Sequence, residues 1–291
     1  MRINFKKNSP NTVVLGDNLQ VLKQLPDESF KLIYIDPPFN TGVKQTRQIM
    51  KTVKNDKGDR TGYKGQIYET TKLKAYCYND NFDNYMEFLG PRIEQAWRLL
   101  REDGTFYLHL DYREVHYVKV FLDNLFGRQH FLNEIIWAYD YGAKAKNKWP
   151  AKHDNILVYV KNPKKYYFNN EQVDREPYMA PGLVTKEKRD KGKLPTDTWW
   201  HTIVSPNGKE KTGYPTQKPL GILRRIIQAS SQENDWVLDF FAGSGTTAVA
   251  ANQLSRKFFT IDQNPQSIEV IKERFKKLNI ENVEFIDNSI Q

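Results

Sequence analysis

Short apolar runs alternate with helix-like segments along most of the chain, and this alternation predicts the fold. Continuous apolar runs are typical of buried strands, and they predict strands at residues 12–16, 31–35, 105–110, 236–240, 257–261 and 283–286. Apolar side chains that recur with the period of a helix predict helices at residues 84–100, 112–125, 220–230, 246–254 and 265–278. Strands separated by helices predict an α/β fold, with a mostly parallel, Rossmann-like sheet that carries helices on both faces.

Two segments interrupt this rhythm. Residues 43–79 are polar and show no sustained period, so the sequence predicts a long connection without regular structure there. Residues 141–213 are rich in Lys, Pro, Tyr and Trp, and they predict an insertion on the α/β body with short strands at 156–160 and 166–168. The chain therefore divides into residues 1–140, the insertion at 141–213, and residues 214–291, and the first and last parts form one domain.

Composition excludes several classes of protein. No apolar run is long enough to span a membrane, and residues 1–10 are polar and basic, unlike a secretory signal. Cys77 is the only cysteine, so the chain can form neither an intrachain disulfide nor a zinc site built on cysteine pairs. These features predict a cytoplasmic protein without a metal centre.

The basic charge is concentrated in two segments. The net charge is +9; residues 40–79 carry nine Lys and Arg against three Asp and Glu, and residues 140–218 carry sixteen against nine. The remainder of the chain is slightly acidic. Diffuse lysine usually reflects solubility alone. Two basic segments rich in aromatic residues, on an acidic scaffold, favour a surface that binds a polyanion such as a nucleic acid.

A glycine-rich turn follows the strand at 236–240 and opens a helix. Its sequence is DFFAGSGTT, from Asp239 to Thr247. Glycine lets the backbone approach a ligand closely, and the free amides of a helix start favour an anionic group. The third glycine of the dinucleotide-binding pattern is missing, which disfavours NAD. The alternative interpretation is a tight strand–helix turn of any α/β protein.

The next predicted strand ends at Asp262. In nucleoside-binding α/β folds, a carboxylate at this place holds the ribose hydroxyls. Taken alone, Asp262 is better interpreted as a helix cap. Together with Gly243 and Gly245 in the preceding turn, it favours a nucleoside ligand.

The segment Asp36-Pro37-Pro38-Phe39 ends another predicted strand. Consecutive prolines remove two backbone donors and hold the chain extended, which leaves carbonyl oxygens beside a carboxylate that only accepts hydrogen bonds when ionised. Such a place attracts a group with hydrogens to donate, such as –NH2, and Phe39 adds a flat face for stacking. The alternative is an ordinary rigid loop.

The chemistry of an exocyclic amine explains this grouping. The amine of adenine or cytosine is a poor nucleophile because its lone pair is conjugated with the ring. If Asp36 and a proline carbonyl accept both of its hydrogens, the nitrogen becomes pyramidal and its lone pair can attack an electrophilic methyl group. The base must leave the duplex to reach such a pocket, and an aromatic side chain can replace the lost stacking.

Together these motifs resemble the DNA amino-methyltransferases that use S-adenosyl-L-methionine, in the β-class order with the Asp-Pro-Pro-Phe motif first. The resemblance covers nearly the whole chain and includes GDN at 16–18, DPPFNTG at 36–42, HDNILVY at 153–159 and YPTQKP at 214–219. Two positions depart from the family pattern. Tyr214 replaces the usual His, and Asp154 replaces the usual Glu.

The resemblance implies a role for particular residues. The catalytic ones would be Asp36, Pro37, Pro38 and Phe39. The cofactor-binding ones would be Asp17, Asn18, Asp36, Thr216, Lys218, Asp239, Phe241, Gly243, Gly245, Thr246 and Asp262. Within this set, the glycine turn would surround the methionine part of the cofactor. Asp262 would bind its ribose, and residues 17–18 would contact its adenine. Asp287 also ends a predicted strand and competes with Asp17, which is favoured because it precedes the helix leading to Asp36.

The predicted function is site-specific methylation of adenine N6 in double-stranded DNA, with residues 141–213 as the target-recognition region. Cytosine N4 is the alternative, and Asp at the head of the motif favours adenine because Ser is commoner there in cytosine enzymes. Other interpretations are an RNA or protein methyltransferase, a DNA-binding relative without catalysis, and a nicotinamide oxidoreductase. The sequence leaves a homodimer and a restriction-endonuclease partner open. Candidates for DNA contact are Trp199, Trp200, Lys209 and Lys211.

Overall fold

The computed structural model describes residues 5–6, 8–42, 45–54, 60–61, 67–78, 80–142, 144–205 and 207–289. Within these residues, nine strands form one sheet in the order β12-β1-β11-β10-β2-β6-β8-β7-β9. The strands are β1 (Asn11–Leu15), β2 (Phe30–Ile35), β6 (Leu100–Leu110), β7 (Phe131–Ala138), β8 (His153–Val160), β9 (Thr198–Trp200), β10 (Trp236–Asp239), β11 (Lys257–Asp262) and β12 (Val283–Asp287). The strands from β12 to β6 run parallel, whereas β8 runs antiparallel to β6 and β7.

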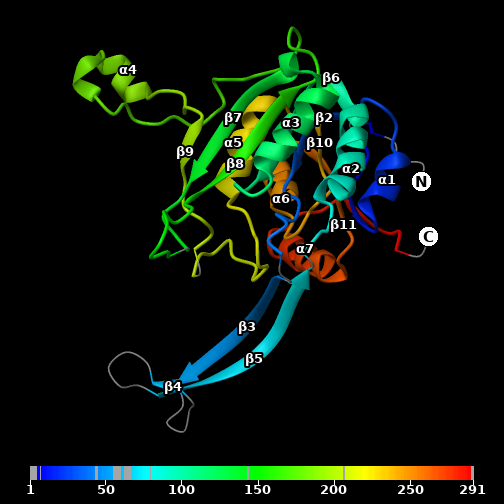
Figure 1. Ribbon diagram of the computed structural model, residues 1–291, viewed down its shortest axis with the longest axis vertical. Helices are drawn as coiled ribbons and strands as arrows, with labels where there is room; N and C mark the ends of the chain where they lie inside the picture. Colours follow the sequence, from blue (N-terminus) through cyan, green and yellow to red (C-terminus); the bar gives the residue numbers. More distant parts are fainter. Residues whose placement is uncertain are drawn as a thin grey trace.

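Helices cover both faces of this sheet (Figure 1). One face carries α1 (Asn18–Lys23), α2 (Tyr85–Leu99) and α3 (Val115–Phe126), and the other carries α5 (Leu220–Ser230), α6 (Thr246–Gln253) and α7 (Pro265–Lys277). Every residue of β2 is buried because its side chains meet a helical layer whichever way they point. The predicted Rossmann-like sheet, mostly parallel and covered on both faces, is therefore confirmed.

Polar side chains fix where several of these helices begin. Asp17, Asn84 and Asn264 each precede a helix, and each accepts a hydrogen bond from a backbone amide in the first helical turn. Such caps satisfy amide groups that have no partner inside the helix. Two of them, Asp17 and Asn264, thereby also fix the chain where it leaves a strand of the sheet.

The prediction for residues 43–79 was wrong. Instead of an irregular connection, the described residues of this segment form an antiparallel sheet of β3 (Gln45–Lys54), β4 (Arg60–Thr61) and β5 (Ile67–Tyr78). This sheet extends away from the α/β body (Figure 1). The alternation of apolar and polar residues that reveals a strand arises when one face packs on a core, and this sequence lacks that alternation.

The insertion predicted at 141–213 contributes to the main sheet. The strand expected at 156–160 is the longer β8, which pairs with both β6 and β7, whereas residues 166–168 form no strand. The remainder of the segment contains the short helices η3 (Pro181–Leu183) and α4 (Lys186–Lys191), and β9 adds three residues to the sheet edge. A further short helix, η2 (Arg128–His130), leads into β7.

Candidate active site

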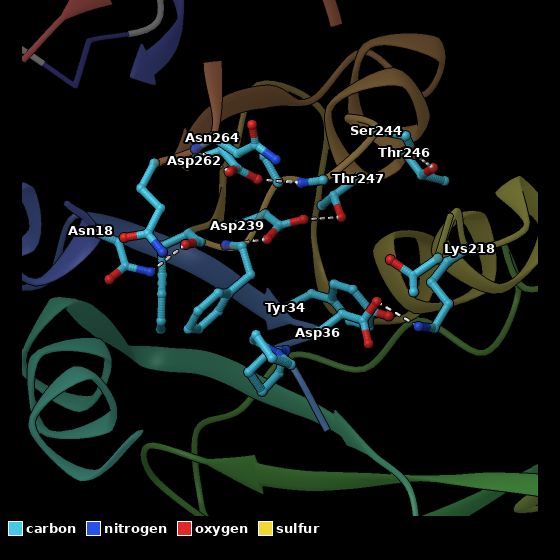
Figure 2. Close-up of a pocket in the computed structure, with 18 of the residues that line it drawn as sticks. Asn18, Tyr34, Asp36, Lys218, Asp239, Ser244, Thr246, Thr247, Asp262 and Asn264 are labelled. Atoms are coloured by element: carbon cyan, nitrogen blue, oxygen red, sulfur yellow. Dashed lines mark hydrogen bonds and ion pairs between the residues drawn. The ribbon is translucent and has the colours of Figure 1, made fainter. Parts of the chain in front are cut away.

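The carboxyl ends of β2, β10 and β11 surround a cavity of about 220 Å³, here called the strand-end cavity. Ligands of parallel α/β sheets bind at this edge. The segment 36–39 and the glycine turn at 239–247 meet there, although they lie far apart in the sequence (Figure 2). The predicted site residues that line the cavity are Asn18, Asp36, Pro37, Pro38, Phe39, Thr216, Lys218, Asp239, Phe241, Gly243, Thr246 and Asp262.

The Asp36 carboxylate is held at one oxygen and open at the other. Lys218 donates from Nζ to Oδ2 of Asp36 over 2.6 Å, and the two side chains are only 11% and 14% exposed (Figure 2). Oδ1 of Asp36 is buried and has no hydrogen-bond partner among the described residues. Because a buried acceptor without a partner costs stability, this atom is a natural place for a ligand to donate a hydrogen.

Phe39 contacts both a cation and a second ring. The Lys218 ammonium lies 4.9 Å from the centre of the Phe39 ring, and the His109 imidazole centre lies 5.8 Å away with the planes inclined by 36°. The carbonyl of Pro38 already accepts a hydrogen bond of 2.7 Å from the Tyr85 hydroxyl. Phe39 and Pro38 are therefore both anchored by side chains from neighbouring elements.

The two glycines of the turn serve different purposes. Gly243 has a φ of +51° and lines the cavity, and a Cβ there would lie 3.2 Å from the Tyr214 ring. Gly245 has a φ of +71° and precedes α6, but it is absent from the described residues that line the cavity. A Cβ at Gly245 would lie 2.8 Å from Cγ1 of Ile271, so this glycine lets α6 pack against α7.

Asp239 is buried at the end of β10, and its hydrogen-bond donors are neutral. Thr247 Oγ1 donates to Oδ2 over 2.6 Å, and the Phe241 amide donates to Oδ1 over 3.0 Å. Burial raises the pKa of the Asp239 carboxyl to about 7 against these two hydrogen bonds, and the carboxylates of Asp36 and Asp262 add to the rise. A cationic ligand in the cavity would favour its ionised form.

Asp262 joins the glycine turn to β11. Its Oδ2 accepts the amide of Gly243 and its Oδ1 accepts the amide of Asn264, each over 2.8 Å. Burial raises the pKa of this carboxyl, although both amide hydrogen bonds oppose the rise. Each carboxylate oxygen keeps a further lone pair, so Asp262 can still accept hydrogen bonds from a hydroxyl of a ligand.

The turn between β1 and α1 supplies the other end of the cavity. Asn18 donates from Nδ2 to the Phe240 carbonyl over 2.7 Å, and Arg92 donates from Nε to Oδ1 of Asn18 over 2.6 Å. Asp17 is not among the described lining residues; it caps α1 and lies 3.3 Å from an Arg92 nitrogen. The competing candidate Asp287 is exposed on the edge strand β12 and does not line the cavity. The turn after β1, by contrast, reaches the cavity through Asn18.

A family model for DNA methylases matches residues 30–273, which is most of the chain. The chain belongs to this family of DNA amino-methyltransferases. Two curated relatives are the Type II methyltransferase M.HpaI of Haemophilus parainfluenzae, 31% identical over 90% of this chain and 73% of that protein, and the DNA adenine methyltransferase YhdJ of Escherichia coli K12, 31% identical over 90% and 82%.

Solved structures agree on the fold. The PvuII DNA methyltransferase, described as cytosine-N4-specific, superposes with a TM-score of 0.63 at 17% identity and covers 97% of both chains. The complex of M1.HpyAVI with S-adenosyl-L-methionine superposes with a TM-score of 0.56 at 22% identity, over 91% of this chain and 98% of that one. The protein is thus a methylase that uses S-adenosyl-L-methionine and modifies the amino group of adenine or cytosine in DNA.

A second cavity of this methylase, here called the outer cavity, has a volume of about 840 Å³. It shares Tyr214, Thr216 and Lys218 with the strand-end cavity, so the two spaces adjoin at these residues. Its remaining walls are rich in aromatic and basic side chains, namely Tyr112, Arg113, Trp137, Tyr139, Tyr141, Lys144, Lys148, Trp149 and Lys211. This composition suits stacked bases and phosphate groups.

The four residues of the methylase that were predicted to contact DNA differ in their exposure. Trp199 is only 6% exposed, and the Arg225 guanidinium lies 4.9 Å from its ring; the expectation that it reaches DNA was therefore wrong. Trp200 and Lys209 are exposed, and Lys211 lines the outer cavity. Tryptophan pairs look alike in sequence, but alternate side chains of β9 point to opposite sides of the strand.

Several site residues escaped the sequence reasoning. Tyr34 and Arg92 line the strand-end cavity, Tyr85 holds Pro38, and His109 contacts Phe39. A signal existed only for Tyr34, because residues two apart on a strand share a face and Tyr34 lies two positions before Asp36. The others come from α2 and β6, where they lie within otherwise apolar patterns.

The described residues contain no group of three or more His, Cys, Asp or Glu side chains arranged to hold a metal ion. Within the same residues, no helix is long and apolar enough to cross a membrane.

Proposed function

We propose that this methylase transfers a methyl group from S-adenosyl-L-methionine to N6 of adenine at a specific sequence in double-stranded DNA. The observation that carries the proposal is Oδ1 of Asp36, a buried acceptor without a partner among the described residues, on a side chain that lines the strand-end cavity next to Lys218. An exocyclic amine can donate the hydrogen bond that no described residue supplies to this atom.

The Asp-Pro-Pro-Phe motif supplies two acceptors for the amine. The Tyr85 hydroxyl already donates to the Pro38 carbonyl. The second acceptor is therefore the carbonyl of Pro37, which lines the cavity. Hydrogen bonds to Asp36 and Pro37 draw both amine hydrogens to one side. The nitrogen lone pair then points away from them, toward the methyl donor, and positioning and electrostatics supply the catalysis.

Phe39 and the outer cavity accommodate the base. The base must leave the duplex to reach Asp36, and stacking on Phe39 offsets part of the stacking lost. The outer cavity adjoins this place, and its aromatic and basic side chains suit the neighbouring nucleotides and phosphates. Residues 141–213 supply many of these side chains, in keeping with their proposed role in target recognition.

The opposite side of the strand-end cavity suits the cofactor. S-Adenosyl-L-methionine supplies the electrophilic methyl group on a sulfonium. Asp239 provides a buried carboxyl group for a ligand with positive charge, Asp262 provides lone pairs for ribose hydroxyls, and Gly243 keeps the wall open where a Cβ would press on Tyr214. Asn18, at the end of the cavity, fits the adenine of the cofactor.

Two observations support adenine as the target. Asp heads the catalytic motif, as in adenine enzymes of this family, and the relative YhdJ is named a DNA adenine methyltransferase. Cytosine N4 is the second candidate, because the amine of cytosine can donate to the same two acceptors. The PvuII enzyme, named cytosine-N4-specific, supports the shared fold alone.

The test is methylation of unmodified genomic DNA by the purified protein, followed by sequencing that detects modified bases at single-base resolution. We expect N6-methyladenine at one sequence motif and none when S-adenosyl-L-methionine is omitted. N4-methylcytosine instead would replace the adenine assignment. Unmodified DNA, with methyl groups found on RNA or protein in parallel reactions, would overturn the proposed substrate.

A further inference from the structure

His109 is a buried titratable side chain to which the proposed methyl transfer gives no role. It lies on β6 and is fully buried. Its Nδ1 lies 2.8 Å from the Tyr34 hydroxyl on β2, and its Nε2 lies 3.1 Å from Oδ2 of Asp154 on β8. The Tyr139 hydroxyl donates to the other Asp154 oxygen over 3.0 Å. Four side chains therefore form one continuous hydrogen-bonded chain beneath the site.

The charge of Asp154 fixes the direction of the two hydrogen bonds that it accepts. Burial alone would raise the pKa of the Asp154 carboxyl, but the hydrogen bonds from His109 and Tyr139 and the nearby Lys218 charge bring it below its usual value. An ionised Asp154 can only accept. His109 must then donate from Nε2, and its Nδ1 forms the hydrogen bond with the Tyr34 hydroxyl. These two hydrogen bonds give the imidazole one favoured orientation.

This chain connects the two cavities. Tyr34 lines the strand-end cavity, whereas Asp154 and Tyr139 line the outer cavity. His109 lies between them on the middle one of three neighbouring strands, β2, β6 and β8. Its ring also packs against Phe39, at 5.8 Å, and edge-on against Trp137, at 5.5 Å. The imidazole thus has hydrogen bonds at both nitrogens and aromatic contacts to residues of both sites.

We propose that His109 is a positioning residue for methyl transfer: held by Tyr34 and Asp154, it fixes the plane of the Phe39 ring on which the target base stacks. The inference rests on the proposed function, because it needs Phe39 to receive the base. A ring held at both nitrogens cannot rotate without breaking a buried hydrogen bond, which costs free energy. The orientation of Phe39 is therefore set before the base arrives.

The chemistry of Asp154 separates this role from a proton relay. A relay needs a carboxylate that can take up a proton, whereas positioning needs only an acceptor for the Nε2 hydrogen of His109. Asparagine keeps an acceptor oxygen and loses the charge. Asp154→Asn therefore retains the geometry, and Asp154→Leu removes both acceptor and charge.

The experiment compares kcat, KM for unmethylated genomic DNA, and the dissociation constant of S-adenosyl-L-methionine across four variants. We expect His109→Phe and Asp154→Leu to lower kcat about 10- to 100-fold, the effect of a misplaced reacting group, with cofactor affinity close to wild type. Asp154→Asn should stay near the wild-type kcat. Tyr34→Phe removes only a hydroxyl, so it folds even if His109→Phe does not, and it should lower kcat by a smaller factor.

His130→Phe is the matched control. His130 also packs edge-on against an aromatic ring, Trp97 at 5.4 Å, and hydrogen-bonds a backbone carbonyl through Nδ1, but it contacts no residue of the catalytic motif. We expect it to leave kcat unchanged.

Wild-type kcat in both Tyr34→Phe and Asp154→Leu would overturn the inference, and loss of kcat in Asp154→Asn would replace it with a proton relay. Failure of the wild-type protein to methylate DNA would instead refute the proposed function.

Discussion

Asp36, which is partly buried, and Asp239, which is buried, are carboxyl groups at neighbouring strand ends, and they differ in their partners. Asp36 pairs with the Lys218 ammonium, whereas among the described residues the Asp239 carboxyl group has a hydroxyl and an amide as its donors. Burial raises the pKa of Asp239 to about 7. Asp36 therefore has a cationic donor at one oxygen before any ligand binds, whereas a cationic ligand beside Asp239 would favour the ionised form of that carboxyl group.

The difference fits the two tasks that the proposed function gives to the cavity. The amine of a base is neutral, so the group that receives it has to be a ready acceptor before the substrate binds. A sulfonium cofactor carries its own positive charge, so the carboxyl group near it, Asp239, can ionise when that charge arrives. The protein thus avoids an excess of uncompensated negative charge where Asp36, Asp239 and Asp262 lie close together.

Removing Asp36 tests the first half of this comparison and should have the largest effect. Asp36→Ala removes the proposed acceptor of the amine hydrogen, so we expect methyl transfer to fall about 100- to 1,000-fold, the scale of a lost electrostatic contact at a reacting group. Binding of S-adenosyl-L-methionine, measured by calorimetry, should remain. Asp287→Ala removes an exposed carboxylate at the end of β12 and serves as the control. Turnover near wild type in Asp36→Ala would contradict the assignment.

Neutralising Lys218 would make Asp36 resemble Asp239. Lys218→Met keeps the length of the side chain and removes the charge, and breaking a buried ion pair on one side is strongly destabilising. The Asp36 carboxylate then loses the donor that orients it. We expect kcat to fall about 10- to 100-fold because the acceptor is misplaced.

The Lys218 variants need controls for charge and for surface effects. Lys218→Arg retains the cation and should restore much of the activity. Lys277→Met removes an exposed lysine at the end of α7, which lines neither cavity, and should leave kcat unchanged. If Lys218→Met and Lys218→Arg lose activity equally, the ion pair is not what holds Asp36.

The chemistry of the site was predictable where it lies in continuous motifs. Asp36 to Phe39 and the turn at 239–247 both follow apolar runs, and parallel strands bring their carboxyl ends to one edge of the sheet. The ion pair between Asp36 and Lys218 joins residues 182 positions apart. Nothing in the local pattern of either residue indicates the other, so such a contact depends on the tertiary fold.

The errors have equally specific causes. The strands β3 and β5 lack the apolar alternation that marks a strand packed on a core, so their pattern resembled a loop. Strand β8 lies next to the basic connection after β7, and composition alone assigned both to one insertion. His109 lies in the apolar run of β6, and a single polar residue in such a run predicts nothing until its partners on β2 and β8 are known.

The titration of Asp239 gives the smallest effect and tests the second half of the comparison. With a pKa of about 7, Asp239 is mostly protonated at pH 6 and mostly ionised at pH 8. Only the ionised form complements a cationic ligand, so affinity for S-adenosyl-L-methionine should rise about tenfold over this range. Asp239→Asn should bind more weakly and remove most of that pH dependence; an unchanged dependence in the variant would contradict the assignment.

The same carboxyl group also links stability to pH in the absence of cofactor. Its pKa in the folded state, about 7, lies above the ordinary value of 3.8. Between these two pH values the folded state therefore keeps a proton that the unfolded state has released. The free energy of unfolding should therefore decline as pH rises from 4 to 7, and thermal unfolding of Asp239→Asn should lack this part of the slope. Saturating S-adenosyl-L-methionine should offset the decline, because binding to the folded, ionised form stabilises it.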